Sequence, residues 1–74
     1  MAQEIIEVPI TGKIISVEVN AGSDVEEGDV ICYVESMKME NPILAPVAGK
    51  VVEIQVSKGE AVEVGKVIAV IEYD

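Results

Sequence analysis

The residue with the most suggestive chemistry is Lys38, in the stretch ESMKMEN that covers residues 35–41. The chain has five basic residues against fourteen acidic ones, yet this lysine stands between Met37 and Met39, two of its three methionines. Lysine is normally a solvated surface charge, whereas methionine normally packs in a core. A primary amine is a nucleophile only when it is deprotonated. An ordinary lysine, with a pKa of about 10.4, is protonated at neutral pH and must be activated from outside. An amine between two apolar side chains therefore indicates a surface that another protein recognises.

The rest of the composition excludes most other chemistry. There is no histidine and only one cysteine, Cys32, so His-based catalytic and metal sites, a cysteine pair that holds zinc and an internal disulfide are all impossible within the chain. No GxxxxGK[ST] or GxGxxG motif is present for nucleotides. A net charge of −9 argues against binding to a nucleic-acid backbone. We therefore expect no catalytic residue, no metal site and no nucleic-acid partner.

The location of the chain is also constrained. No apolar run approaches the roughly 18 residues that a membrane span needs, and the N-terminus lacks the features of a signal peptide. The lone thiol of Cys32 fits a reducing compartment. We expect a cytoplasmic protein with no membrane partner.

The elements that must position Lys38 are strands. The chain contains 14 valines and 10 isoleucines, which favour β-structure, and no segment has a sustained helical period. IISVEV (14–19) alternates, which predicts Ile15, Val17 and Val19 on one face and Ser16 and Glu18 on the other. VVEIQV (51–56) repeats this pattern, with Glu53 and Gln55 as its polar positions. VICYV (30–34) and VIAVI (67–71) are apolar on both faces, which predicts central strands.

An internal repeat predicts how these strands are arranged. Residues 9–35 lie over residues 46–72 without a gap, at an offset of 37, with eleven identities in 27 positions. Glycines recur together, which indicates backbone positions that need a positive φ or a close approach in both halves. We predict one all-β domain over residues 1–74, built as two half-sheets packed face to face around a pseudo-twofold axis.

The repeat also places Lys38. The last strand of the first copy should end near Ser36 and the next should begin near Met39, which puts Lys38 at a hairpin tip. Its image under the offset is position 75, just past the end of the chain. We expect Lys38 at the pole opposite the chain ends, with an exposed ammonium and at least one exposed methionine beside it.

At these residues the sequence resembles the biotin carboxyl carrier and lipoyl-attachment domains. Met37-Lys38-Met39, preceded by Glu35 and Ser36, looks like the family's E-A-M-K-M signature with serine in place of alanine. The segments PxxGK (9–13) and APVAGKV (45–51), with glycines at the expected turns, support the resemblance, which covers essentially the whole chain. It implies two four-stranded antiparallel sheets in a flattened barrel.

The resemblance also implies a function. Lys38 would be the covalent acceptor of biotin, supplied by a biotin protein ligase that reads Met37, Met39 and Glu35. The protein would be a non-catalytic carrier whose arm moves a carboxyl group between biotin carboxylase and carboxyltransferase sites. Two alternatives stay open: a lipoyl carrier, which usually lacks the paired methionines, and an unmodified interaction module of the same fold.

Some residues near the signature also have plainer interpretations. Met37 and Met39 could pack within the hairpin. Glu35 could serve structure or solubility, because its repeat counterpart Glu72 has no lysine to serve. Cys32 aligns with Ala69, which predicts an inert core residue.

Overall fold

The computed structural model describes all 74 residues and contains eight strands and no helix. The β-branched segments form the long strands, and glycine-containing polar clusters separate them. The strands are β1 (Ala2–Glu7), β2 (Gly12–Val17), β3 (Asp24–Val25), β4 (Val30–Ser36), β5 (Met39–Leu44), β6 (Gly49–Ile54), β7 (Ala61–Val62) and β8 (Val67–Tyr73). The all-β prediction is confirmed.

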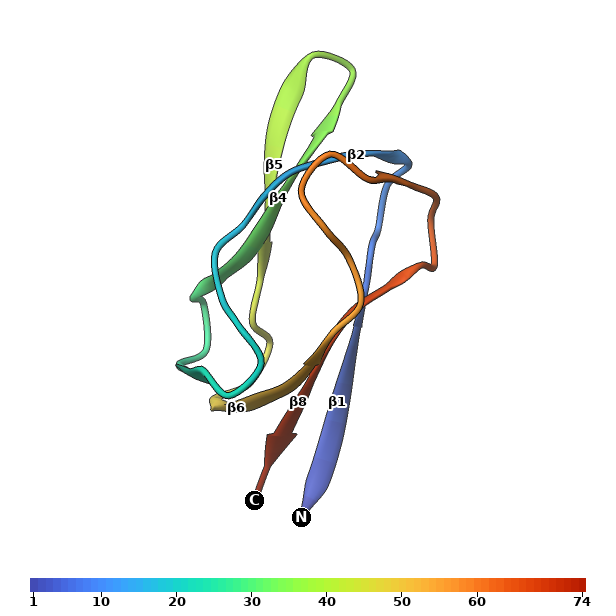
Figure 1. Cartoon of the computed structure of the whole chain (residues 1–74). Coiled ribbons are helices and arrows are strands. Elements are labelled where there is room, and N and C mark those ends of the chain that lie inside the picture. The colour runs from blue at the N-terminus through green and yellow to red at the C-terminus, as the bar shows by residue number, and fades with distance from the viewer.

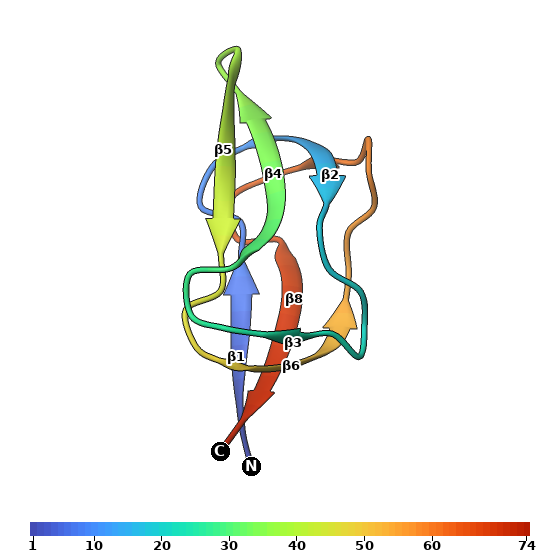
Figure 2. The same cartoon turned by 90° about the vertical axis from the view of Figure 1, so that its left-hand side faces the viewer.

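The strands form two four-stranded antiparallel sheets, with the orders β1-β8-β6-β3 and β5-β4-β2-β7 (Figures 1 and 2). The doubly apolar segments are β4 and β8, and each has a partner strand on both sides, which confirms the prediction of central strands. β5 lies at a sheet edge, where Pro42 can be accommodated because its missing N–H removes no inner ladder hydrogen bond.

The internal repeat is present in the backbone. Every strand of the first half recurs 37 residues later, and the correspondence includes β1 and β5, which lie outside residues 9–35 and 46–72. The hydrogen bonds between the halves recur as well: the Gly22 N–H donates to the carbonyl of Val51 at 2.6 Å, and the Gly59 N–H donates to that of Ile14 at 2.7 Å. Each half completes the other's sheet, which gives the predicted pseudo-twofold barrel.

Paired glycines have the two roles predicted for them. A Cβ on Gly12 would collide with the backbone carbonyl oxygen of Glu35, and one on Gly49 with that of Glu72, so both positions need the absent side chain. The four other glycines, at the turns, have φ between 90° and 98°. The repeat therefore conserves backbone geometry between its halves.

One detail of the alternation was predicted wrongly. Ile14 is fully buried in the core, whereas Ile15 is only half-buried and lies outside the core cluster. A β-bulge between Ile14 and Ser16 inserts an extra residue against β4, so the alternation changes phase there. Val17 and Val19 do pack against the core, as predicted.

The second half repeats this deviation. Val51 is fully buried and Val52 is exposed, with a bulge between Val51 and Glu53. Both bulges increase local twist and help the sheets curl into a closed shape.

A single core cluster of 15 buried side chains fills the space between the sheets. It contains no buried polar or charged residue. The molecule is elongated, 36 × 18 × 16 Å, with the β4–β5 hairpin at one end and the two chain ends together at the other (Figures 1 and 2). The predicted placement of Lys38 opposite the termini is confirmed.

Candidate cofactor-attachment hairpin

The candidate site is the tip of the β4–β5 hairpin. Ser36 pairs with Met39, so the turn contains two residues, Met37 and Lys38. Their φ angles are 54° and 66°, and they are the chain's only non-glycine residues with positive φ. A two-residue hairpin loop with both central residues at positive φ is a type I′ turn, which normally contains Asn-Gly.

This turn stores backbone strain. A side-chain-bearing L-residue in the left-handed region costs roughly 1–2 kcal/mol, and such residues cluster at functional sites. The sequence indicated the turn but not its strain, although the two-residue gap between strands was a usable signal for a primed turn. An L-lysine held in this conformation presents its side chain at the outermost point of the hairpin.

The amine is surrounded by solvent and apolar side chains. Met37 is 91% exposed and Met39 is 65% exposed, and Lys38 is exposed between them. Because most of both side chains is exposed, little of their surface packs within the hairpin. Both methionines are therefore available to a partner that approaches the lysine.

The hairpin beneath the tip is held by more than its strand ladder. β4 and β5 are paired over six residue pairs, and the Asn41 side-chain amide donates to the carbonyls of Val34 at 3.3 Å and Met39 at 3.2 Å. These bonds tie β5 to itself and to β4 two residue pairs below the Ser36–Met39 pair that closes the turn. The sequence interpretation missed Asn41, for which an amide residue before Pro42 was the only signal.

Glu35 lies on the same hairpin, one residue pair below the turn. It is exposed, and its Cα partners are Glu40 on β5 and Lys13 on β2. Like charges directly opposite one another destabilise a strand pair by about 0.2–1 kcal/mol. The sequence interpretation selected Glu35 but neither Glu40 nor Lys13, because only the pairing register brings the three together.

Cys32 lies on β4 but faces the core. It is fully buried, as is its repeat counterpart Ala69, and desolvation raises the pKa of its thiol from 9.0 to about 11. A thiol kept protonated in an apolar core is a poor nucleophile. The prediction of a core residue is confirmed.

The hairpin suits a covalently attached acyl cofactor. Attachment requires an accessible primary amine on a rigid protrusion, and Lys38 meets both conditions without an ion pair. No group of three or more His, Cys, Asp or Glu side chains could hold a metal ion. The structure contains no helix that is long and apolar enough to cross a membrane.

Solved structures show what the fold is similar to. The urea carboxylase of Kluyveromyces lactis superposes with a TM-score of 0.90 at 33% identity, over 97% of this chain and 6% of that chain. A single-chain, multi-domain long-chain acyl-CoA carboxylase superposes with a TM-score of 0.87 at 26% identity, over 92% and 7%.

Curated relatives are similar over about half of the chain. The glutaconyl-CoA decarboxylase subunit gamma of Acidaminococcus fermentans is 49% identical over 39 residues, which cover 53% of this chain and 27% of the relative. The methylmalonyl-CoA decarboxylase subunit gamma of Veillonella parvula is 45% identical over 42 residues, 57% and 33% of the two chains. Biotinylated protein TB7.3 of Mycobacterium tuberculosis is 43% identical over 45 residues, 61% and 62%. The matched segments thus span between 27% and 62% of these relatives' lengths.

The family itself is established by a match to most of the chain. The sequence model of the Biotin_lipoyl family, described as "Biotin-requiring enzyme", matches residues 4–71. This range includes all eight strands, in whole or in part, together with the lysine-bearing hairpin. The chain belongs to the Biotin_lipoyl family and is a biotin-requiring, non-catalytic carrier domain.

Proposed function

We propose that a biotin protein ligase biotinylates Lys38, and that the biotinyl arm carries a carboxyl group between a biotin carboxylase and a carboxyltransferase. The observation that carries the proposal is the exposed Met37-Lys38-Met39 turn at the pole opposite the chain ends. Residues 1–74 act as one attachment domain, with residues 9–35 and 46–72 as its halves.

Attachment is an acyl transfer to nitrogen. The Lys38 Nζ, once deprotonated, attacks the activated carbonyl of biotinyl adenylate, an amide bond forms, and AMP leaves while the proton passes to solvent. No acid or base on the hairpin needs to take part, because the ligase brings the activated acyl group. Met37 and Met39 lie on either side of the amine and provide apolar contacts for the ligase, while Glu35 provides a charge one pair below.

After attachment, the residues of the hairpin hold the attachment point of the cofactor in a fixed position. The lysine loses its positive charge, its stem becomes part of a flexible tether, and the paired strands with Asn41 fix the point from which the arm swings. Bound biotin supplies a ureido nitrogen that accepts and releases a carboxyl group. Tethering raises the local concentration of the ring at each partner's active site into the mM range.

Relatives point to the class of partner. The relatives from Acidaminococcus fermentans and Veillonella parvula are gamma subunits of acyl-CoA decarboxylases. We propose an acyl-CoA as the carboxyl donor or acceptor, and a cytoplasmic setting for the biotin ligase that modifies the chain. Transfer in the decarboxylating direction is the second candidate, favoured by the two gamma subunits.

The test is intact-mass analysis after incubation with a biotin ligase, ATP and biotin, with Lys38→Arg as the matched control. We expect one biotinyl group on the wild type and none on the variant, which keeps the charge but offers the ligase no suitable amine. Modification of Lys13, Lys50, Lys58 or Lys66 in the variant would contradict the assignment. A parallel reaction with a lipoate ligase distinguishes the alternative cofactor.

A further inference from the structure

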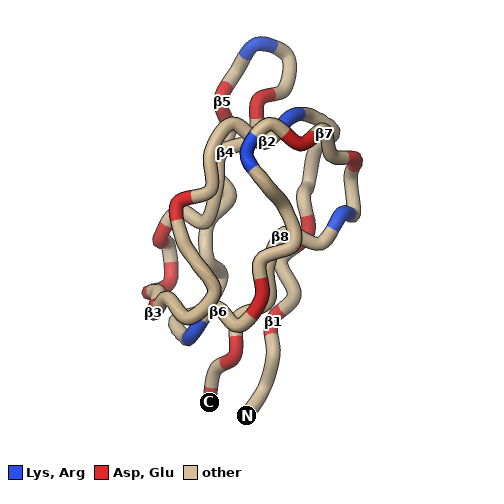
Figure 3. The backbone as a smooth tube through the Cα atoms, in the orientation of Figure 1, with Lys and Arg blue, Asp and Glu red and all other residues tan.

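A groove of about 300 Å³ lies beneath the hairpin, on the side of the sheet that carries the row Lys13–Glu35–Glu40. Its lining includes Lys13, Glu35, Glu40 and Lys58, with Ile15 as an apolar contribution. Figure 3 shows further lysines close below the one at the hairpin tip, near β2 and β7. Three of the chain's five lysines, Lys13, Lys38 and Lys58, thus belong to this end of an acidic molecule.

The four charged side chains of this groove form no ion pair and no side-chain hydrogen bond. The structure's one ion pair joins Lys66 and Glu60, and no side-chain hydrogen bond involves any of the four. Glu35 and Glu40 face one another across the ladder at some cost to the hairpin. The groove therefore offers two free ammonium donors and two free carboxylate acceptors.

These groups match one particular ligand chemistry. A cyclic urea has one carbonyl acceptor and two N–H donors, so ammonium groups can donate to its oxygen while carboxylates accept from its N–H groups. We propose that this groove is a docking site for the ureido ring of the chain's own biotinyl arm. Lys13 and Lys58 donate to the ring carbonyl, Glu35 and Glu40 accept from the ring nitrogens, and Ile15 contacts the apolar part. The proposal rests on biotin attachment at Lys38.

The distance suits the tether. Glu35 and Glu40 are three and two residues from Lys38, which is roughly 10 Å or less along a strand. The four-carbon lysine stem together with the valeryl chain of biotin can fold back over that distance. Because the ring is tethered, even an affinity in the mM range would populate the docked state.

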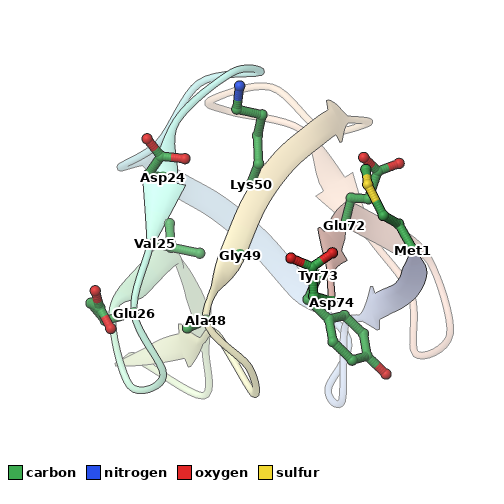
Figure 4. Close-up of a pocket in the computed structure, with 10 residues that line it drawn as sticks. All are labelled: Met1, Asp24, Val25, Glu26, Ala48, Gly49, Lys50, Glu72, Tyr73 and Asp74. Carbon is green, nitrogen blue, oxygen red and sulfur yellow. The ribbon is translucent and has the colours of Figure 1, made fainter.

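The pseudo-twofold axis supplies an internal comparison. The opposite pole has a groove of about 640 Å³ that includes Lys50 and Glu72, the counterparts of Lys13 and Glu35. Figure 4 shows one lysine there, with the carboxylates of Asp24, Glu26, Glu72 and Asp74 around the groove.

The two poles differ at the residues that the docking uses. Lys58 corresponds to Ala21 in the other half, and Glu40 corresponds to Gln3. Ala61, the strand partner of Lys13, corresponds to Asp24, the partner of Lys50. The groove beneath the hairpin thus has two lysines and two carboxylates that face one another across the ladder, whereas the opposite groove has one lysine among four acidic residues.

The first test needs no biotinylated protein. Unmodified Lys38→Arg protein is titrated with biotin methyl amide at mM concentration while backbone amide NMR shifts are recorded. We expect saturable shifts at Lys13, Glu35, Glu40 and Lys58, and a loss of most of them in a Lys13→Met variant. Lys50→Met, the matched change at the other pole, should leave them intact. Absence of groove shifts, or equal effects of the two variants, overturns the proposal.

The second test uses biotinylated protein whose mass has been verified. If docking hides the ring, avidin captures it at a rate reduced by the undocked fraction. We expect Lys58→Met to speed capture about twofold, because a tether concentration and an affinity that are both in the mM range leave about half of the ring docked. Lys50→Met should leave the capture rate unchanged. Equal capture rates in all three proteins overturn the docking. A lack of biotin at Lys38 would instead refute the proposed function, and the first test would still decide whether the groove binds the ring.

Discussion

The strained turn allows a sharp test, because one substitution should make the protein more stable. Met37 has a φ of 54° and is 91% exposed, so its side chain contributes little packing while its backbone occupies an unfavourable region. Asparagine tolerates the left-handed region far better than methionine does and is common in type I′ turns. We therefore expect Met37→Asn to stabilise the fold.

The magnitude follows from the strain at one residue. The left-handed conformation costs an ordinary residue roughly 1–2 kcal/mol, of which asparagine recovers a part, so the gain should be about 0.5–1 kcal/mol. For a domain of this size, that corresponds to a rise in Tm of roughly 3–6 °C. Thermal and urea unfolding followed by circular dichroism measure it.

Met39→Asn is the matched control. Met39 begins β5 and is not among the residues with positive φ, and asparagine is disfavoured in strands, so this variant should lose a few tenths of a kcal/mol. A Met37→Asn protein that is no more stable than wild type would refute the strain argument. So would an equal gain from Met39→Asn.

Three further predictions concern the ligase, the close approach of the strands and the buried thiol. Replacing Met37 and Met39 by Ala should slow biotinylation by a biotin ligase far more than it alters unfolding, since one well-packed apolar contact is worth about 1–3 kcal/mol of discrimination. An unchanged biotinylation rate in the double variant would refute this. Gly12→Ala should destabilise the domain by about 2–3 kcal/mol in urea unfolding, because the new Cβ meets the backbone carbonyl oxygen of Glu35. An unchanged midpoint would mean that β4 can move away at little cost. Because the folded-state pKa of Cys32 is raised from 9.0 to about 11, stability should be unaffected below pH 9 and fall as pH rises through about 11. Cys32→Ala should remove that component of the pH profile, and an unchanged profile would contradict it.

Much of the site could be predicted from the sequence because its information is local. The strand ends near Ser36 and Met39 leave only two residues between them, so Lys38 had to occupy a hairpin tip. The 37-residue offset then placed that tip opposite the chain ends. The counterparts of β4 and β5 are β8 and β1, and the two termini lie at the position that corresponds to the β4–β5 turn. Residue types and spacing were sufficient for both inferences.

Side-chain phase in the bulged strands could not be predicted in this way. Strict alternation in IISVEV places Ile15 on the face of Val17 and Val19, but a bulge against β4 puts Ile14 in the core instead. The same choice recurs at Val51 and Val52. A bulge arises from how two strands fit the curvature of a closed sheet, which is not encoded in the periodicity of one strand.

The sequence by itself determined the all-β class, the twofold repeat and an exposed lysine between two methionines, because β-branched composition, glycine spacing and a short gap are properties of neighbouring residues. The tertiary structure alone decided that Glu35 faces Glu40 and Lys13, and that Lys58 joins them in one groove. Those residues are far apart in the chain or on different strands. Cross-strand register, fixed by burial of one face of each strand, is what brings their charges together.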